Sequence, residues 1–222
     1  MNVTRLFLVR HGATSATQED RFWGWSGAEL SEQGRWQAAR LGERLSHQNI
    51  TAAYSSPLSR ALDTARIIAE QCGLEPATRD GLREMGHGHW ESMKRQDVEE
   101  QFAAEYAAWE RDSFRCAPEG GESGLGVLAR ALPVIREIVT THPGGRVLVV
   151  SHKATLRLVL SSLLAFDPRG YRDRLDQSPA CLNVLDFRDP VRVRLMLFND
   201  TSHYADRPRI SEQSLSKWWN QA

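Results

Sequence analysis

The chain has 222 residues, of which 41% are hydrophobic and 8% aromatic, and its 28 Lys and Arg residues balance 28 Asp and Glu residues. This length and apolar content predict a single folded domain over residues 1–222 and exclude a disordered chain. A net charge of zero gives no general electrostatic reason to bind nucleic acid or an anionic membrane. No apolar run approaches the length that spans a bilayer. We therefore expect neither nucleic acid nor a membrane as a partner.

The N-terminal stretch and the cysteines bear on the cellular compartment. Met1–Leu8 is a short apolar stretch that lacks the pattern of a secretion signal. Cys72, Cys116 and Cys181 are odd in number and widely spaced, which disfavours a disulfide framework or a cysteine zinc site. These features favour a cytoplasmic protein with reduced thiols.

Strands and helices are predicted to alternate from the start of the chain. Arg5–Val9 is a short apolar run typical of a buried strand, and Ser31 is positioned to cap a helix with apolar residues at helical spacing up to Leu45. Ile50–Tyr54 predicts a second strand. Ser56 then predicts the N-cap of another helix, with a proline in its first turn.

The second half of the chain continues this alternation. It predicts a helix with Pro133 as a possible kink, then a strand, a helix and two late strands. The segments are Leu125–Val139, Arg146–Val150, Leu156–Leu163, Cys181–Phe187 and Val191–Phe198. The whole pattern predicts an α/β fold, a three-layer sandwich in which helices cover both faces of a mostly parallel central sheet. In such sheets, ligands bind at the carboxyl ends of the strands.

Polar residues suited to one reaction follow these predicted strand ends. Arg10 and His11 follow the first strand, and Arg60 lies in the first turn of the helix after the second strand. His152 follows a later strand, and Glu84 lies on a loop. Each residue alone is more often a surface charge or a helix cap than part of a functional site. Their joint position at one edge of the predicted sheet is what favours a functional site.

Phosphoryl transfer is the chemistry that this set of residues fits. Arg10 and Arg60 can each bind two phosphoryl oxygens, and the start of a helix beside Arg60 also favours an anion. A neutral imidazole can attack phosphorus, and we assign that role to His11. His152 would stabilise the oxyanion, and Glu84 would protonate the leaving alkoxide. No metal is needed, because the arginines and histidines supply the positive charge.

The motifs around these residues resemble those of the histidine phosphatase (phosphoglycerate mutase-like) superfamily. Leu8–Thr14 looks like its RHG signature, which alone would be a weak signal. Further similar segments follow in order through nearly the whole chain: Leu30–Ala38, Ser55–Ala65, Leu82–Glu91, Gly120–Ser123, Val150–His152 and Asn199–His203. The resemblance implies a phosphorylated nucleophile at His11 and an acid/base at Glu84, with no cofactor. It also implies a phosphoryl group surrounded by Arg10, Arg60 and His152.

Further positions near the expected site are candidates for contact with the substrate. Thr17 stands where the family often has an Asn that contacts phosphate, and its hydroxyl can still donate. Lys153 replaces a glycine after the last family histidine; it either adds charge for an acidic substrate or is a solvated helix residue. Trp23 and Trp25 flank Gly24 and either wall the substrate pocket or pack nearby. We include Thr17, Trp23, Gly24 and Lys153 among the expected substrate-binding residues.

Other signals are weaker. His87, His89 and Glu91 have a spacing that metal ligands can show, but a loop with one or both histidines lining the pocket is favoured. Six cations are candidates for the pocket lining: Arg35, Arg83, Lys94, Arg95, Arg115 and Lys153. Trp218 and Trp219 are compatible with a docking or homo-oligomer contact.

Three functions remain open from the sequence. The first is a phosphatase, in which water hydrolyses the phosphohistidine of a small phosphorylated metabolite. The second is a cofactor-dependent phosphoglycerate mutase; Arg21–Trp25 resembles that group, but residues 84–120 lack the paired arginines of its insert. The third is a non-catalytic phosphate-binding protein, which has no need of an acid and a nucleophile together. We favour the phosphatase.

Overall fold

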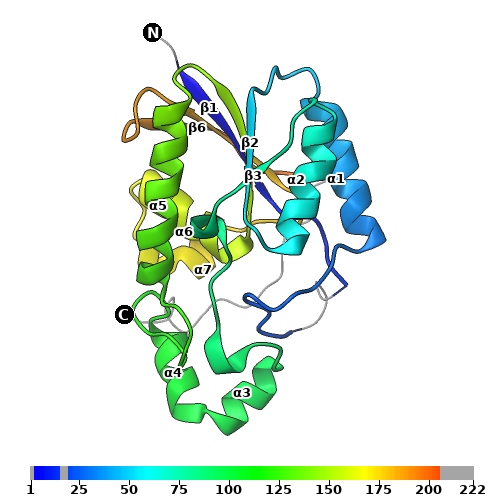
Figure 1. Cartoon of the computed structure of the whole chain (residues 1–222). Helices are drawn as coiled ribbons and strands as arrows, with labels where there is room; N and C mark the ends of the chain where they lie inside the picture. The colour runs from blue at the N-terminus through cyan, green and yellow to red at the C-terminus, as the bar shows by residue number, and fades with distance from the viewer. Residues whose placement is uncertain (1–2, 16–19, 206–222) are drawn as a thin grey trace.

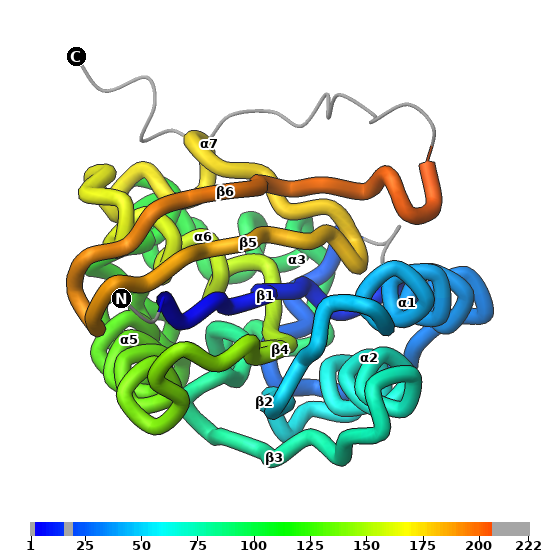
Figure 2. The backbone as a smooth tube through the Cα atoms, turned by 90° about the horizontal axis from the view of Figure 1, so that it is seen from above, coloured from blue at the N-terminus to red at the C-terminus, as the bar shows by residue number. Residues whose placement is uncertain are grey.

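The computed structural model describes residues 3–15 and 20–205. Within these residues, a six-stranded sheet with the spatial order β3-β2-β4-β1-β5-β6 forms the centre of the protein (Figures 1 and 2). Its strands are β1 (Thr4–Arg10), β2 (Ala52–Ser55), β3 (Ala77–Thr78), β4 (Arg146–Ser151), β5 (Leu182–Phe187) and β6 (Val193–Asp200). The pairs β1–β4, β4–β2 and β2–β3 are parallel, whereas β5 is antiparallel to both neighbours. The expected mostly parallel sheet is therefore confirmed.

The central strand β1 is buried on both faces of the sheet. Leu6 and Leu8 belong to one apolar cluster, and Phe7 and Val9 belong to a second cluster on the opposite face. Alternate side chains of a strand point to opposite faces, so a continuous apolar run is what a strand covered on both sides requires.

Four long helices form the outer layers. α1 (Glu32–Leu45) and α2 (Ser59–Glu70) pack on one face, and α5 (Gly124–Thr141) and α6 (Lys153–Leu163) pack on the other. The predicted three-layer α/β sandwich is confirmed. Figure 1 shows α3 (Arg95–Gln101) and α4 (Ala103–Arg111) below the sheet, beyond the carboxyl ends of its parallel strands. The short elements are η1 (Asp80–Leu82), η2 (Gly88–Trp90), η3 (Pro168–Gly170) and α7 (Tyr171–Arg174).

A capping serine predicts the start of α1 correctly but not the start of α2. The hydroxyl of Ser31 accepts the backbone N–H of Gly34, as expected of an N-cap. The prediction that Ser56 caps α2 is wrong, because α2 begins at Ser59 with Leu58 at the N-cap position. The Ser56 hydroxyl instead accepts the N–H of Leu58 at 3.2 Å within the turn before the helix.

The last strand, β6, which pairs antiparallel with β5, also begins later than expected. β6 starts at Val193, not at Val191, because the Asp189 carboxylate accepts the backbone N–H groups of Val191 and Arg192 at 2.9 and 2.8 Å. These bonds hold the residues in the turn. Among the described residues, no helix combines the length and apolar character needed to cross a membrane.

Candidate active site

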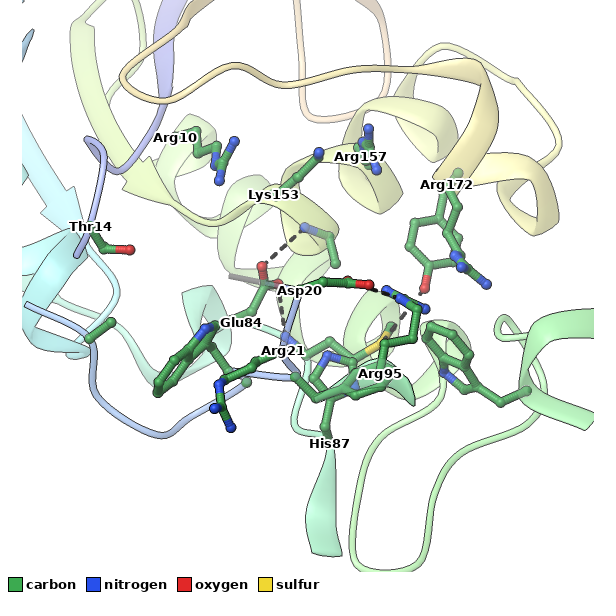
Figure 3. A pocket seen from close by; sticks show the side chains of 18 of the residues that line it. Arg10, Thr14, Asp20, Arg21, Glu84, His87, Arg95, Lys153, Arg157 and Arg172 are labelled. Carbon is green, nitrogen blue, oxygen red and sulfur yellow. Dashed lines mark hydrogen bonds and ion pairs between the residues drawn. The ribbon is translucent and has the colours of Figure 1, made fainter. Parts of the chain in front are cut away.

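The strand ends that the sequence analysis singled out border one pocket of about 690 Å³ (Figure 3). Seven of the expected site residues line it: Arg10, His11, Trp23, Gly24, Arg60, Glu84 and Lys153. His152 lies directly behind this lining, with its ring centroid 5.1 Å from that of His11. Thr17 lies outside the described residues, as do Trp218 and Trp219.

His11 is buried in a neutral form with one nitrogen available. Its Nδ1 lies 2.8 Å from the carbonyl oxygen of Gly12, and since a carbonyl only accepts, Nδ1 carries the proton. The neutral ring therefore keeps a lone pair on Nε2. Burial lowers the pKa of His11 well below 6.5, and the positive charges of Arg10 and Arg60 lower it further. At neutral pH the side chain can therefore act as a nucleophile without first losing a proton.

The loop that carries His11 is fixed by two helices. Gly12 donates its N–H to the Thr64 hydroxyl on α2 at 3.1 Å, and Ala13 donates to the Gln37 side chain on α1 at 3.0 Å. A Cβ on Gly12 would collide with the carbonyl of Gly34, at the start of α1. Gly12 is thus required for this close approach of α1.

Two guanidinium groups, that of buried Arg60 and that of half-buried Arg10, lie near His11. Arg60 is 4% exposed and donates to the carbonyl oxygens of Gly24 and Ser26 at 2.7 and 3.2 Å. Arg10 donates through Nη1 to the carbonyl of Gln177 at 2.7 Å. Burial lowers the pKa of both arginines, which nevertheless stay charged. Neutral carbonyls hold the two cations in place without cancelling their charge, so the pocket attracts an anion.

His152 is fully buried and has one nitrogen without a partner. Its Nε2 lies 2.8 Å from the Ser56 hydroxyl, and its Nδ1 has no hydrogen-bond partner in the described part of the chain. Burial lowers the pKa of His152 well below 6.5, and the charge of Arg60 adds to this. The ring is thus neutral in the ligand-free protein.

The Glu84 carboxyl group is held at the start of α6. It accepts the backbone N–H groups of Ala154 and Thr155 at 3.2 Å each, and that of Met85 at 2.9 Å. The carboxylate therefore has a fixed position in the pocket lining, beside the helix that follows His152.

Arg130 on α5 supports the loop that carries Glu84, and no motif in the sequence marks it. Its guanidinium donates to the carbonyl oxygens of Gly81, Arg83 and Glu84 at 2.9, 3.0 and 2.9 Å. It also pairs with the Glu122 carboxylate at 2.7 Å. Arg130 is a positioning residue for the Glu84 loop.

The segment around Gly24 forms another wall. The Glu91 carboxylate accepts the N–H groups of Trp25 and Ser26 at 2.7 Å each. Gly24 has φ +33°, and a Cβ there would collide with Glu91. Trp23 lines the pocket, whereas Trp25 is 44% exposed and its indole donates to the Glu84 carbonyl at 2.7 Å.

Charged residues extend the pocket beyond the phosphoryl site. Of the six cations expected to reach it, Arg95 and Lys153 line it, and Arg35, Arg83, Lys94 and Arg115 do not. Three further lining arginines, Arg21, Arg157 and Arg172, were missed. The only sequence signal for Arg157 is its position four residues after Lys153, which puts both on one side of a helix.

Of the two histidines expected near the pocket, His87 and His89, only His87 lines it. Burial lowers the pKa of His87 to about 4. His89 instead pairs with Glu105 at 2.8 Å. Within the described ranges, no three His, Cys, Asp or Glu side chains gather in a way that suits a metal ion.

The family model of the histidine phosphatase superfamily (branch 1) matches residues 6–201 of this chain. Phosphoserine phosphatase 1 of Hydrogenobacter thermophilus is 33% identical over 165 residues, covering 74% of this chain and 78% of that protein. A glucosyl-3-phosphoglycerate phosphatase of Mycolicibacterium vanbaalenii is 38% identical over 140 residues, covering 63% of this chain and 62% of that protein. Phosphoglycerate mutase-like protein 4 of Arabidopsis thaliana is 36% identical over 206 residues, covering 91% and 88%.

Solved structures agree in fold. A mycobacterial glucosyl-3-phosphoglycerate phosphatase superposes with a TM-score of 0.80 at 30% identity, covering 89% of this chain and 99% of that chain. YhfR of Bacillus stearothermophilus superposes with a TM-score of 0.84 at 28% identity, covering 90% and 98%.

Proposed function

Because the chain belongs to the histidine phosphatase superfamily (branch 1) and is a histidine phosphatase enzyme, we propose that it hydrolyses a small phosphomonoester through a phosphohistidine on His11. The relatives named for phosphoserine and glucosyl-3-phosphoglycerate support a small phosphorylated metabolite as substrate. The observation that carries the proposal is the contact of His11 Nδ1 with the Gly12 carbonyl oxygen, which leaves Nε2 unprotonated in a ring near the charges of Arg10 and Arg60.

In the first step, Arg10 and Arg60 bind the oxygens of the phosphoryl group. Nε2 of His11 attacks phosphorus, and the bond to the ester oxygen breaks on the opposite side. The leaving alkoxide takes a proton from Glu84, which becomes a carboxylate. Nδ1 of His152, which lacks a partner in the ligand-free protein, donates to a phosphoryl oxygen and stabilises the transition state.

In the second step, water attacks the phosphorus of phosphohistidine. The Glu84 carboxylate takes a proton from this water, and the bond between phosphorus and Nε2 of His11 breaks. Inorganic phosphate leaves, and both side chains return to their starting states. The fixed cations provide the positive charge for both steps, so the proposed reaction uses no metal ion.

Trapping the covalent intermediate tests the proposal. Rapid quenching of the wild-type protein with a ³²P-labelled phosphomonoester should yield acid-labile, base-stable labelled protein, and turnover should persist in EDTA. The His11→Ala variant should give neither label nor turnover. His89→Ala is the matched control, since His89 pairs with Glu105 outside the pocket. Label retained in His11→Ala would exclude His11 as the nucleophile.

A parallel assay separates the phosphatase from the mutase. Incubation with 3-phosphoglycerate and bisphosphoglycerate should release inorganic phosphate faster than it forms 2-phosphoglycerate. Faster isomerisation than phosphate release would assign the chain to the mutases.

A further inference from the structure

Three cations line one wall of the pocket beside the proposed phosphoryl site. Arg10 ends β1, and Lys153 and Arg157 lie one turn apart on α6, so that both project from the same side of that helix. Figure 3 shows the three side chains next to one another along this wall. Arg157 is 9% exposed and the Lys153 side chain 24% exposed. The wall is therefore a group of cations largely withdrawn from water.

One carboxylate pairs with both α6 cations. Oδ1 of Asp176 lies 2.8 Å from Nη2 of Arg157 and 3.4 Å from Nζ of Lys153. Arg10 is held by a neutral group, the carbonyl of Gln177. Burial lowers the pKa of Lys153 to about 8, and the charges of Arg157 and Arg10 contribute against the attraction of Asp176. Among the described residues of this wall, three cations thus lie near one carboxylate.

Hydrogen bonding at this wall is also incomplete. Within the described residues, Nε of Arg10 and Nε of Arg157 are buried and have no hydrogen-bond partner. Buried charges that are incompletely compensated are costly in surroundings of low polarity. A phosphoryl group between Arg10 and Arg60 would compensate Arg10, whereas Lys153 and Arg157 share the single carboxylate of Asp176.

The lining around Arg95 and Arg172 has no comparable excess. Arg95 pairs with Asp20 at 3.1 Å, and Arg172 pairs with Glu110 at 2.7 Å. The remaining arginine of that part, Arg21, is accompanied by a third carboxylate, Asp173. The pocket of about 690 Å³ has room for a substrate much larger than a phosphoryl group. The α6 wall is thus where the pocket has charge to bind a second part of the substrate.

We propose that Lys153 and Arg157 form a subsite for a second anionic group, a carboxylate or a phosphate, on the substrate that is hydrolysed. This inference rests on the proposed function, since it takes the reacting phosphoryl group to lie at Arg10 and His11. It assigns the substrate to phosphomonoesters that carry another negative charge, in preference to phosphates of neutral alcohols. The planar fork of Arg157 suits the paired oxygens of such a group.

Matched synthetic substrates test the subsite. Phosphate monoesters of ω-hydroxycarboxylic acids of increasing chain length are compared with their primary amides by kcat/KM. The wild-type protein should prefer the acid, most strongly at one chain length. Lys153→Gln and Arg157→Gln should each lower the acid-to-amide ratio roughly tenfold or more, because each removes a charge-assisted hydrogen bond. Bisphosphates of α,ω-diols, compared with their monophosphates, distinguish a second phosphate from a carboxylate.

Two further variants control the test. Arg169→Gln removes an exposed arginine that pairs with Asp167 outside the pocket, and it should leave the ratio unchanged. Asp176→Asn removes the competing carboxylate, and it should raise the preference for the acid. A merely structural role for this cluster does not produce opposite changes from Lys153→Gln and Asp176→Asn.

Turnover of p-nitrophenyl phosphate separates the possible failures. If the wild-type protein hydrolyses it but the acid-to-amide ratio stays near one at every length, the subsite is wrong and the proposed function stands. The same holds if a clear preference survives both Lys153→Gln and Arg157→Gln in variants that still hydrolyse p-nitrophenyl phosphate. If the wild-type protein hydrolyses none of these phosphomonoesters, the proposed function itself is wrong.

Discussion

Glu84 combines a fixed position with a role that depends on the substrate. Backbone N–H groups of Met85, Ala154 and Thr155 hold its carboxylate in the pocket lining. An alkyl phosphate needs a proton on its leaving oxygen, whereas p-nitrophenolate leaves without one. The identity of the leaving group therefore isolates the part that Glu84 plays in the first step.

We predict that Glu84→Gln slows alkyl phosphates far more than p-nitrophenyl phosphate. The loss for an alkyl phosphate should be roughly hundredfold or more, the usual contribution of a positioned general acid. Single-turnover rates of phosphoenzyme formation on both substrates measure this. Equal losses on the two substrates would remove Glu84 from the acid role.

The place of a residue in the site was predictable where the residue belongs to a sequence motif. It was not predictable where the residue contacts the site from a distant part of the sequence. Arg10 and His11 follow a strand directly, so their common site follows from the rule that strand ends meet at one edge. Arg130 reaches the Glu84 loop from a helix nearly fifty residues away in sequence. Nothing local distinguishes it from Arg136, an exposed arginine of the same helix.

At the scale of elements, the segment around Gly24 connects Glu91, which follows the Glu84 loop, to Arg60 of the proposed phosphoryl site. The Gly24 carbonyl oxygen accepts a hydrogen bond from Arg60. The backbone N–H groups of the next two residues donate to the Glu91 carboxylate. We predict that Gly24→Ala raises KM and lowers kcat/KM at least tenfold. The positive φ strains any side chain at this position, and a Cβ would collide with Glu91. The Gly24 carbonyl, which accepts from Arg60, must therefore move. Steady-state kinetics with p-nitrophenyl phosphate measure the change.

Gly27→Ala is the matched control in the same segment. A Cβ there meets no atom within 4 Å, so activity and thermal stability should stay at wild-type values. If Gly24→Ala behaved like Gly27→Ala, the segment would not position Arg60.

Elements that pack on the sheet were predictable, and those that pack elsewhere were missed. The helix after Ser31 had both a cap and apolar spacing, and it forms as expected. The helices α3 and α4 bury Val98, Tyr106 and Trp109 in a separate small cluster with Phe22 and Trp90. This packing leaves no apolar stripe aimed at the sheet. Such a cluster depends on distant loops that periodicity does not reveal.

At the scale of the whole molecule, several buried histidines make stability depend on pH. Burial lowers the pKa of His11 and His152 well below 6.5, and that of His87 and His203 to about 4. Between the folded pKa and 6.5, the unfolded chain binds a proton that the folded protein does not. The free energy of unfolding must therefore fall as the pH falls below about 6.5.

We predict a loss of roughly 2 kcal/mol from His87 alone between pH 7 and pH 5, from its pKa of about 4 against 6.5 in the unfolded chain. Urea unfolding of the wild-type protein and His87→Asn at both pH values measures it. The variant should lose less stability on acidification by about that amount. Equal losses would show that His87 titrates normally in the folded protein.

The close contact between Gly12 and the first turn of α1 ties the reaction centre to the scaffold. The same loop is bonded to Thr64 of α2, whose hydroxyl in turn donates to the Arg60 carbonyl at 2.7 Å. His11 and Arg60 are therefore held in a fixed relative position, independently of the residues that line the rest of the pocket. In the proposed mechanism, phosphoryl transfer and substrate choice thus depend on separate residues. The walls around Lys153 and Arg95 can then change during evolution toward a new metabolite while the residues that transfer the phosphoryl group stay the same.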